Sequence, residues 1–207
     1  MNGARWLLLL AAFGALGLTG CIEVRSTVAE NGGVVSTMVV TAHQAYAARV
    51  QDYLGEQYSD WGFTQKAEGE EVQFTGTRVF GSNDTVLEAS PPEKPRAQVT
   101  IKQEGLSLVY EFVDPFQMPP IPDDPSAQRT AATIAVTCTL TMPGPIEEAA
   151  SASRIEGNTA IWNLTAADRD TDIAATARAS QVPRLLVFLV CVAGLVAGYL
   201  LVARPAS

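Results

Sequence analysis

The sequence predicts an α+β fold: an antiparallel sheet of about eight strands with one main amphipathic helix packed on it, plus a C-terminal transmembrane helix. Three observations lead to this class. Short runs of alternating apolar and polar residues, the period of half-buried strands, recur between residues 22 and 183. One segment after residue 41 has the helical period instead. The segment 185–203 is apolar throughout.

The N-terminus is predicted to be a lipoprotein signal peptide over residues 1–20. Arg5 gives it a positively charged N-terminal region, an apolar run follows, and small residues precede the expected cleavage site. Leu18-Thr19-Gly20-Cys21 resembles the lipobox of bacterial lipoproteins, in which the cysteine thiol receives diacylglycerol and the new N-terminus is acylated with chains such as palmitate. An ordinary signal peptide followed by an incidental cysteine, or an uncut signal anchor, is the alternative to lipid attachment at Cys21.

The first two strands are predicted to form a hairpin. Residues 22–28 and 34–40 are apolar, β-branched runs. Asn31-Gly32 stands between them, and Asn-Gly is the strongest short-range signal for a tight turn between two strands.

A helix is expected next, from about Ala42 to Leu54, with continuation past Gly55 to Tyr58 as the alternative end. Thr41 and Gln44 have the spacing of a capping box, in which two side chains satisfy the free N–H groups at a helix start. The apolar residues behind this box recur at helical spacing. We expect this stripe, which includes two tyrosines, to pack in the core rather than to bind a ligand.

Later strands follow from the same alternation. The clearest run is 132–142, which places Val136, Cys138 and Leu140 on one face and threonines on the other. Cys138 is therefore expected to be a buried structural thiol. The proline-rich segment 114–125 is expected to be a loop, either a stiff surface loop or a hydrophobic lip that touches lipid. The other predicted strands are residues 72–74, 99–101, 106–112, 161–164 and 173–179. Of these, 99–101 and 106–112 are expected to form a second hairpin across a tight loop at Gln103 to Gly105.

The C-terminal segment is predicted to cross the membrane. Residues 185–203 carry no charge, lie between Arg184 and Arg204, and at roughly 1.5 Å per residue span about 28 Å as a helix. A removable anchor-attachment tail is the alternative, but the terminal arginine fits a stop-transfer segment better. The chain then divides into a signal peptide at 1–20, an extracytoplasmic domain at 21–183, a transmembrane helix at 184–204 and a cytoplasmic tail at 205–207.

The charge of the domain excludes several classes of partner. All 22 acidic residues fall within 22–183, whereas Arg5, Arg184 and Arg204 lie outside it, so 14 minus 3 leaves 11 basic residues and a net charge of -11. Nucleic acid is therefore not an expected partner. The domain also lacks the excess of basic residues that draws a protein to anionic lipid, so we expect membrane contact to come from anchors.

No catalytic, metal or cofactor motif is present, and we expect a protein that is not an enzyme. His43, the only histidine, has no cysteine near it in the sequence, so a metal site or a histidine-dependent triad lacks its parts. Asp168-x-Asp-x-Asp opens like a calcium loop, but Ile173 stands where that loop needs glycine. Aromatic residues are the candidates for lining a lipid pocket, with ordinary core packing as the alternative for each. They are Trp61, Phe63, Phe74, Tyr110, Phe112 and Trp162.

The segment from Met142 to Ala177 has a recognisable order of features. A strand ends in Met142-Pro-Gly, a hairpin follows whose second strand carries Trp162, and the last strand is rich in alanine. This pattern resembles the LppM-type lipoproteins of mycobacteria and related actinobacteria, and the Asn31-Gly32 turn, the lipobox and the apolar C-terminal segment match the same layout. The resemblance implies an α+β domain, an envelope location and a role in handling lipid or glycolipid. It implies no catalytic residue.

The sequence thus predicts a non-catalytic lipoprotein of the cell membrane, with its domain on the extracytoplasmic face. The expected partners are the membrane, through the lipid anchor and the C-terminal helix, and a lipid or lipoglycan ligand. No metal or cofactor is expected. Two alternatives stay open: an interaction or scaffold protein for envelope assembly, and a cell-wall enzyme whose carboxylate pair is brought together by folding.

Overall fold

The chain folds into two β-sheets that share one hydrophobic core. The structure is a computed structural model, and it describes residues 21–80, 97–116, 125, 128–129, 132–168, 171–182, 186, 188 and 190–192. The predicted signal peptide, residues 117–124 of the proline-rich segment and most of 184–207 lie outside these residues.

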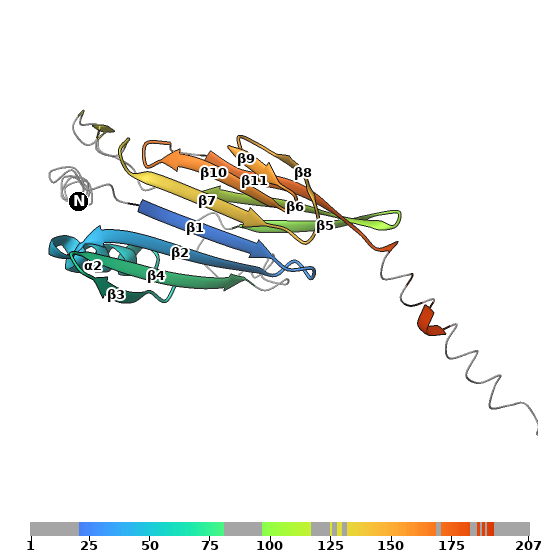
Figure 1. Ribbon diagram of the computed structural model, residues 1–207, viewed down its shortest axis with the longest axis horizontal. Helices are drawn as coiled ribbons and strands as arrows, with labels where there is room; N and C mark the ends of the chain where they lie inside the picture. The colour runs from blue at the N-terminus through green and yellow to red at the C-terminus, as the bar shows by residue number, and fades with distance from the viewer. Residues whose placement is uncertain are drawn as a thin grey trace, which may run out of the picture.

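The larger sheet, sheet A, has seven strands, and β1 is its middle strand (Figure 1). The β1–β2 hairpin turns through Gly32, whose φ of 84° suits glycine, so the predicted turn at Asn31-Gly32 is confirmed. In the order in which they lie side by side, the strands of sheet A are β3 (Thr64–Glu68), β4 (Glu71–Phe80), β2 (Val34–His43), β1 (Cys21–Val28), β7 (Ala135–Thr141), β10 (Thr159–Thr165) and β9 (Arg154–Glu156).

One pairing in sheet A is parallel. β1 and β7 run in the same direction, with Cys21 opposite Ala135 and Val24 opposite Cys138. Parallel neighbours need a long connection, and here it runs through β2, the helix, β3, β4 and two strands of the second sheet. Sheet A is therefore mixed, and the prediction of an antiparallel sheet is wrong.

The smaller sheet, sheet B, has four antiparallel strands. Its first hairpin turns at Gly105, with a φ of 61°, as predicted. The chain returns to sheet B through Met142-Pro143-Gly144, where Gly144 lies so close to the backbone of Arg178 that a side chain has no room. The strands of sheet B are, side by side, β5 (Gln98–Glu104), β6 (Ser107–Phe116), β11 (Thr171–Ser180) and β8 (Ile146–Ala149).

The helix begins later than the sequence predicts. β2 stays paired with β4 as far as His43, so the strand takes up the residues of the expected capping box. The Nδ1 atom of His43 then accepts a hydrogen bond from the backbone N–H of Ala45 at 3.2 Å. A short 3₁₀ turn, η1 (Gln44–Tyr46), follows, and α2 covers Ala47–Gln57. The predicted start near Ala42 is wrong because strand pairing competes successfully with the cap.

Strand alternation decides which side chains enter the core. On β7, Val136, Cys138 and Leu140 face inward and are buried, as predicted, whereas the threonines between them lie on the outer face. The helix contributes Val50 and Leu54 to the same core. β1 begins at one end of the domain and β11 ends at the other (Figure 1), so the chain enters and leaves at opposite ends.

The observed fold corrects the predicted class in three respects. The described residues form eleven strands in two sheets, where about eight strands in one sheet were predicted. The additional strands are short or lack alternation: all five residues of β3 are exposed, and β8 has four residues. The core is closed mainly by sheet B, and α2 has only 11 residues.

The predicted transmembrane helix is also corrected. Within the described part of the chain, no helix is long and apolar enough to cross a membrane. Most of the predicted segment 184–204 lies outside the described residues.

Candidate functional site

Cys21, the predicted site of lipid attachment, is an exposed residue at the start of β1. Its backbone is held on both sides, opposite Thr41 of β2 and Ala135 of β7. Because Val24 and Ser26 face the core, the alternation of a strand puts the Cys21 side chain on the outer face of sheet A. The thiol is accessible and belongs to a rigid sheet. Lipid attachment itself stays a prediction.

The aromatic residues predicted to line a lipid pocket lie in the core or against it. Four of them are at most 1% exposed, Trp61 is 7% exposed, and Phe63 is partly buried. The four most deeply buried are Phe74, Tyr110, Phe112 and Trp162. These four belong to one packed cluster of side chains, so they stabilise the two-sheet core.

Two of these aromatic residues also use their polar atoms inside the protein. The hydroxyl of Tyr110 donates a hydrogen bond to the backbone carbonyl of Glu30 at 3.0 Å. The indole Nε1–H of Trp162 donates to the backbone carbonyl of Ala150 at 2.8 Å. Each bond ties a loop to the core, because a buried N–H or O–H needs a partner. Trp162 and Tyr110 are therefore structural anchors.

A second aromatic group runs from the last part of α2 into the loop before β3 and reaches the surface. Tyr53, Tyr58, Trp61 and Phe63 form a chain of neighbouring rings, with ring centres 6.3 to 6.5 Å apart. All but Trp61 are only partly buried. Burial raises the pKa of Tyr58 to about 12, so its hydroxyl stays protonated at neutral pH. We call these four residues the aromatic chain.

The aromatic chain contacts sheet A at a glycine of β4. The ring of Phe63 lies over Gly76 of β4, and a β-carbon built at Gly76 would come within 2.6 Å of that ring. The backbone N–H of Thr77 donates to the carbonyl of Trp61 at 2.7 Å, which fixes the loop before β3 along β4. Gly76 is thus required for close approach of the aromatic ring.

Polar side chains also enter the space between the sheets. The hydroxyls of Ser26 on β1 and Ser36 on β2 are buried and lie 2.8 Å apart, so each satisfies the other. Arg78 of β4 stands opposite Ser36 in the sheet. Its Nε lies 3.0 Å from Oδ2 of Asp60, and its guanidinium carbon is 4.1 Å from the centre of the Phe80 ring. Ser26, Ser36 and Arg78 therefore form a polar row across three strands of the inner face of sheet A, with apolar side chains on either side of it.

Asp114 on β6 lies between the sheets near this polar row. Burial raises its pKa to about 6, against the attraction of the Arg78 guanidinium, which lowers it. Burial and the nearby Asp114 carboxylate together raise the pKa of Cys138 to about 12, so this thiol is not a nucleophile at neutral pH. The prediction of Cys138 as a buried structural thiol agrees with this position.

Asp114 is the titratable group that the sequence prediction missed. Tyr110, Phe112 and Asp114 alternate along β6, so all three face inward. This alternation is the signal in the sequence from which the position of Asp114 could have been predicted. The prediction instead assigned it to the proline-rich loop, because Pro115 follows it. β6 in fact continues through Pro115 to Phe116, paired with β11.

The other polar candidates have structural roles. Oδ2 of Asp168 accepts hydrogen bonds from the backbone N–H and the hydroxyl of Thr165, at 2.6 and 2.9 Å, and so closes the turn after β10. His43 caps the 3₁₀ turn, and its Nε2 lies 3.9 Å from the exposed Glu70. Among the residues that the structure describes, no three His, Cys, Asp or Glu side chains group closely enough to hold a metal ion.

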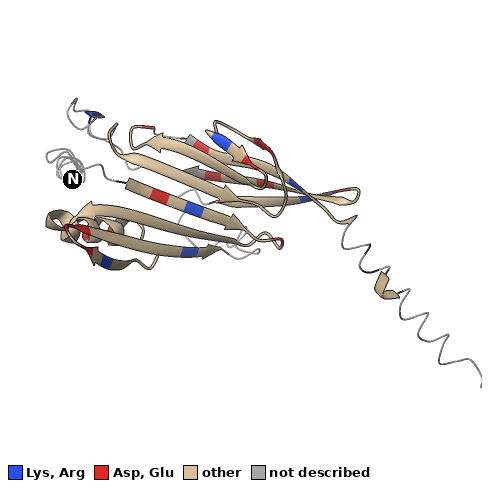
Figure 2. Ribbon diagram, in the orientation of Figure 1, with Lys and Arg blue, Asp and Glu red and all other residues tan. Residues whose placement is uncertain are grey.

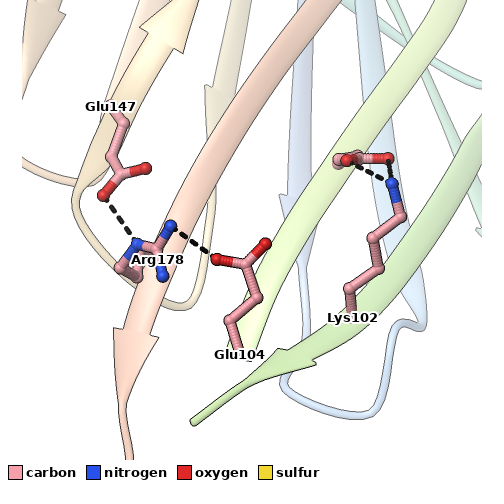
Figure 3. Close-up of polar contacts among 5 residues, drawn as sticks. Lys102, Glu104, Glu147 and Arg178 are labelled. Atoms are coloured by element: carbon pink, nitrogen blue, oxygen red, sulfur yellow. Dashed lines mark hydrogen bonds and ion pairs between the residues drawn. The ribbon is translucent and has the colours of Figure 1, made fainter. Parts of the chain in front are cut away.

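Carboxylates do converge on the outer face of sheet B (Figure 3). Arg178 of β11 pairs with Glu104 of β5 and Glu147 of β8, each at 2.9 Å, and Lys102 pairs with Glu111 across the β5–β6 hairpin. The two carboxylates at Arg178 are neutralised by one guanidinium on a solvated strand surface. This arrangement joins three strands and is not an acid and base pair in a cleft.

Comparison with known proteins gives one distant likeness. No protein-family model matches the chain, and no curated protein does. Among solved structures, the fold is similar to the folded domain of the LppM protein of Mycobacterium tuberculosis, with a TM-score of 0.40 and 12% identity over 78% of this chain and 90% of that chain. This comparison supports only a distant, LppM-like fold. It carries no information about ligands or activity.

Proposed function

We propose that the protein is a non-catalytic lipoprotein, fastened to the extracytoplasmic face of a membrane through Cys21, and that its domain binds lipid or glycolipid there. The observation that carries the proposal is the position of Cys21. The cysteine of Leu18-Thr19-Gly20-Cys21 is exposed and is the first residue of the first strand. A thioether at this atom fastens the sheet without disturbing any buried contact.

The lipid attachment is tested by the mass of the mature chain purified from membranes. Expression in a bacterium with lipoprotein processing should give a chain that begins at Cys21 and carries the mass of diacylglycerol. Cys21→Ser should lose this mass and leave the membrane fraction in larger part than the wild type does. Cys191→Ser is the matched control, because Cys191 is also exposed and lies outside the lipobox. An unmodified Cys21 refutes the proposal.

The lipid-binding part of the proposal assigns the contact to the aromatic chain. Phe74, Tyr110, Phe112 and Trp162 are excluded from this role because packing already fills the space around them. Tyr53, Tyr58 and Phe63 of the aromatic chain are only partly buried, so part of their apolar ring surface is open to solvent. Such a surface suits an acyl chain or the apolar face of a sugar.

Native mass spectrometry of the full chain from its own host tests this assignment. The expected result is a lipid or glycolipid adduct that Phe63→Ala weakens several-fold. Ile155→Ala is the control, because Ile155 is exposed on β9 and does not belong to the aromatic chain. The absence of any adduct above background contradicts lipid binding, and a stable protein partner recovered by crosslinking in the membrane favours the scaffold alternative instead.

A further inference from the structure

The outer face of sheet A is a broad surface of nearly balanced charge on an acidic protein. Over β2, β1, β7 and β10 its only carboxylate is Glu23 and its only lysine or arginine is Arg25, and the two form an ion pair at 2.6 Å. In Figure 2 these strands are tan apart from a red and a blue segment on β1 and the charges near the ends of the sheet. Charges on the edge strands are also paired, Lys66 with Glu68 and Arg154 with Glu156.

We propose that this face lies against the headgroup layer of the bilayer, so that the domain rests flat on the membrane. The inference rests on the proposed lipid attachment at Cys21. It goes further by naming the surface that meets the lipid, which is the outer face of sheet A around Cys21, Thr37, Thr77 and Thr139.

The position of Cys21 gives the first reason. β1 has three strands of sheet A on each side, so the attachment point lies on the midline of the sheet. The side chain points away from the core, and its backbone is fixed by pairing to Thr41 and Ala135. Only a few single bonds of about 1.5 Å each separate that backbone from the glycerol. The sheet therefore stays within a short distance of the headgroups.

Charge decides between a flat and an upright domain. Standing upright on the Cys21 end would press that end of the molecule onto the membrane, and this end is acidic. Bacterial and other anionic surfaces repel such an end. The neutral outer face, rich in threonine hydroxyls that hydrogen-bond phosphate and ester oxygens, has no such penalty. Exposed acids near the Cys21 end include Glu70, Glu71, Asp168 and Asp172.

An apolar pair supplies a second contact at the far end of the same face. Val35 of β2 and Val79 of β4 lie opposite each other, and they are 45% and 69% exposed. Val35 is six residues along β2 from Thr41, the partner of Cys21, which at about 3.3 Å per residue is about 20 Å away. Two apolar contacts separated in this way hold a rigid sheet parallel to the bilayer.

Fluorescence quenching by spin-labelled headgroups tests the orientation. The acylated full chain with Cys191→Ser is placed in phosphatidylcholine and phosphatidylglycerol vesicles, and bimane is attached at Thr77→Cys or at Thr100→Cys. Thr77 and Thr100 are both exposed strand threonines, on sheet A and on the outer face of sheet B respectively. Cys138 does not compete for the label because it is buried. Quenching at position 77 should exceed that at position 100 several-fold.

A second pair of variants tests the apolar contact. Val79→Glu should reduce the quenching at position 77 at least twofold, whereas Leu106→Glu should leave it unchanged. Leu106 is exposed at 56% but lies in the β5–β6 turn, away from the face. Circular dichroism confirms that each variant is folded before it is compared.

Three results would overturn the proposal. Equal or reversed quenching at positions 77 and 100 shows that the face is not turned to the lipid. Disulfide pairing between Thr77→Cys chains, without headgroup quenching, makes the face an interface between copies. A chain whose mass shows no lipid on Cys21 removes the proposed function as well, whereas a lipidated chain with unquenched label removes only the orientation.

Discussion

Replacing Asp114 by Asn should stabilise the domain at neutral pH and remove a specific dependence of its stability on pH. Asp114 lies between the sheets, and burial raises its pKa from 3.8 to about 6 in the folded protein. The folded state therefore holds this proton more tightly than the unfolded chain does. The contribution of protonated Asp114 to the free energy of unfolding is fully present below about pH 4. It is lost as the pH rises through about 6.

The magnitude follows from the size of the shift. A shift of about two pKa units, at about 1.4 kcal/mol per unit, makes the ionised carboxylate cost up to about 3 kcal/mol of folding free energy at pH 7. Asparagine has the same shape and no charge. The free energy of unfolding of Asp114→Asn should thus exceed that of the wild type by up to about 3 kcal/mol above pH 7, and the two should be equal near pH 4.

Urea unfolding followed by tryptophan fluorescence, at several values between pH 4 and 8, measures this difference. Comparing two chains at each pH cancels the other titrating groups. Asp172→Asn is the matched control, because Asp172 is exposed on the neighbouring strand β11. Parallel stability curves for Asp114→Asn and the wild type over the whole range would refute the burial argument, as would an equal gain in Asp172→Asn.

Three further predictions concern the core. Gly76→Ala should lower the free energy of unfolding by about 1 to 3 kcal/mol, because its methyl group meets the Phe63 ring, and Phe63→Leu should recover part of the loss in urea unfolding. Ser36→Ala should cost about 1 to 3 kcal/mol by leaving the buried hydroxyl of Ser26 without its partner, whereas the double alanine variant should be closer to the wild type. Cys138 should resist iodoacetamide at pH 8 in the folded chain and react once urea unfolds it, as read by mass spectrometry, because burial raises its pKa to about 12.

Each of these predictions has a distinct contrary result. A Gly76→Ala chain as stable as the wild type would mean that the Phe63 ring moves aside freely. Additive losses in the two serine variants would mean that the hydroxyls do not satisfy each other. Alkylation of Cys138 in the folded chain at the rate of a free thiol would contradict its burial.

Local elements could be predicted because their signals lie within a few residues. Both hairpins were predicted from turns with glycine at Gly32 and Gly105, where the backbone has a positive φ. The two faces of β7 followed from the alternation around Cys138. The helix was found, but its start was misplaced by the strength of the β2–β4 pairing at His43.

The candidate site was predicted only in part. Cys21 was identified from three preceding residues, and the structure finds it exposed at the start of a strand. The aromatic candidates were chosen by residue type alone, which does not distinguish a pocket from a core. Phe74 and Trp162 lie in the core, while Phe63 lies at its edge. Asp114 was missed because the proline after it suggested a loop.

The strand faces, the tight turns and the cysteine at the front of the domain could be predicted from the order of residues alone, since each depends on neighbours in the chain. The pairing of Cys21 with Ala135, 114 positions away, and the division of the strands into two sheets become visible only in the folded molecule. Which strand edges meet depends on how the whole chain buries its apolar surface, and no short segment carries that information. The same packing decides that Asp114 lies between the sheets and that the outer face of sheet A is left uncovered in the described structure.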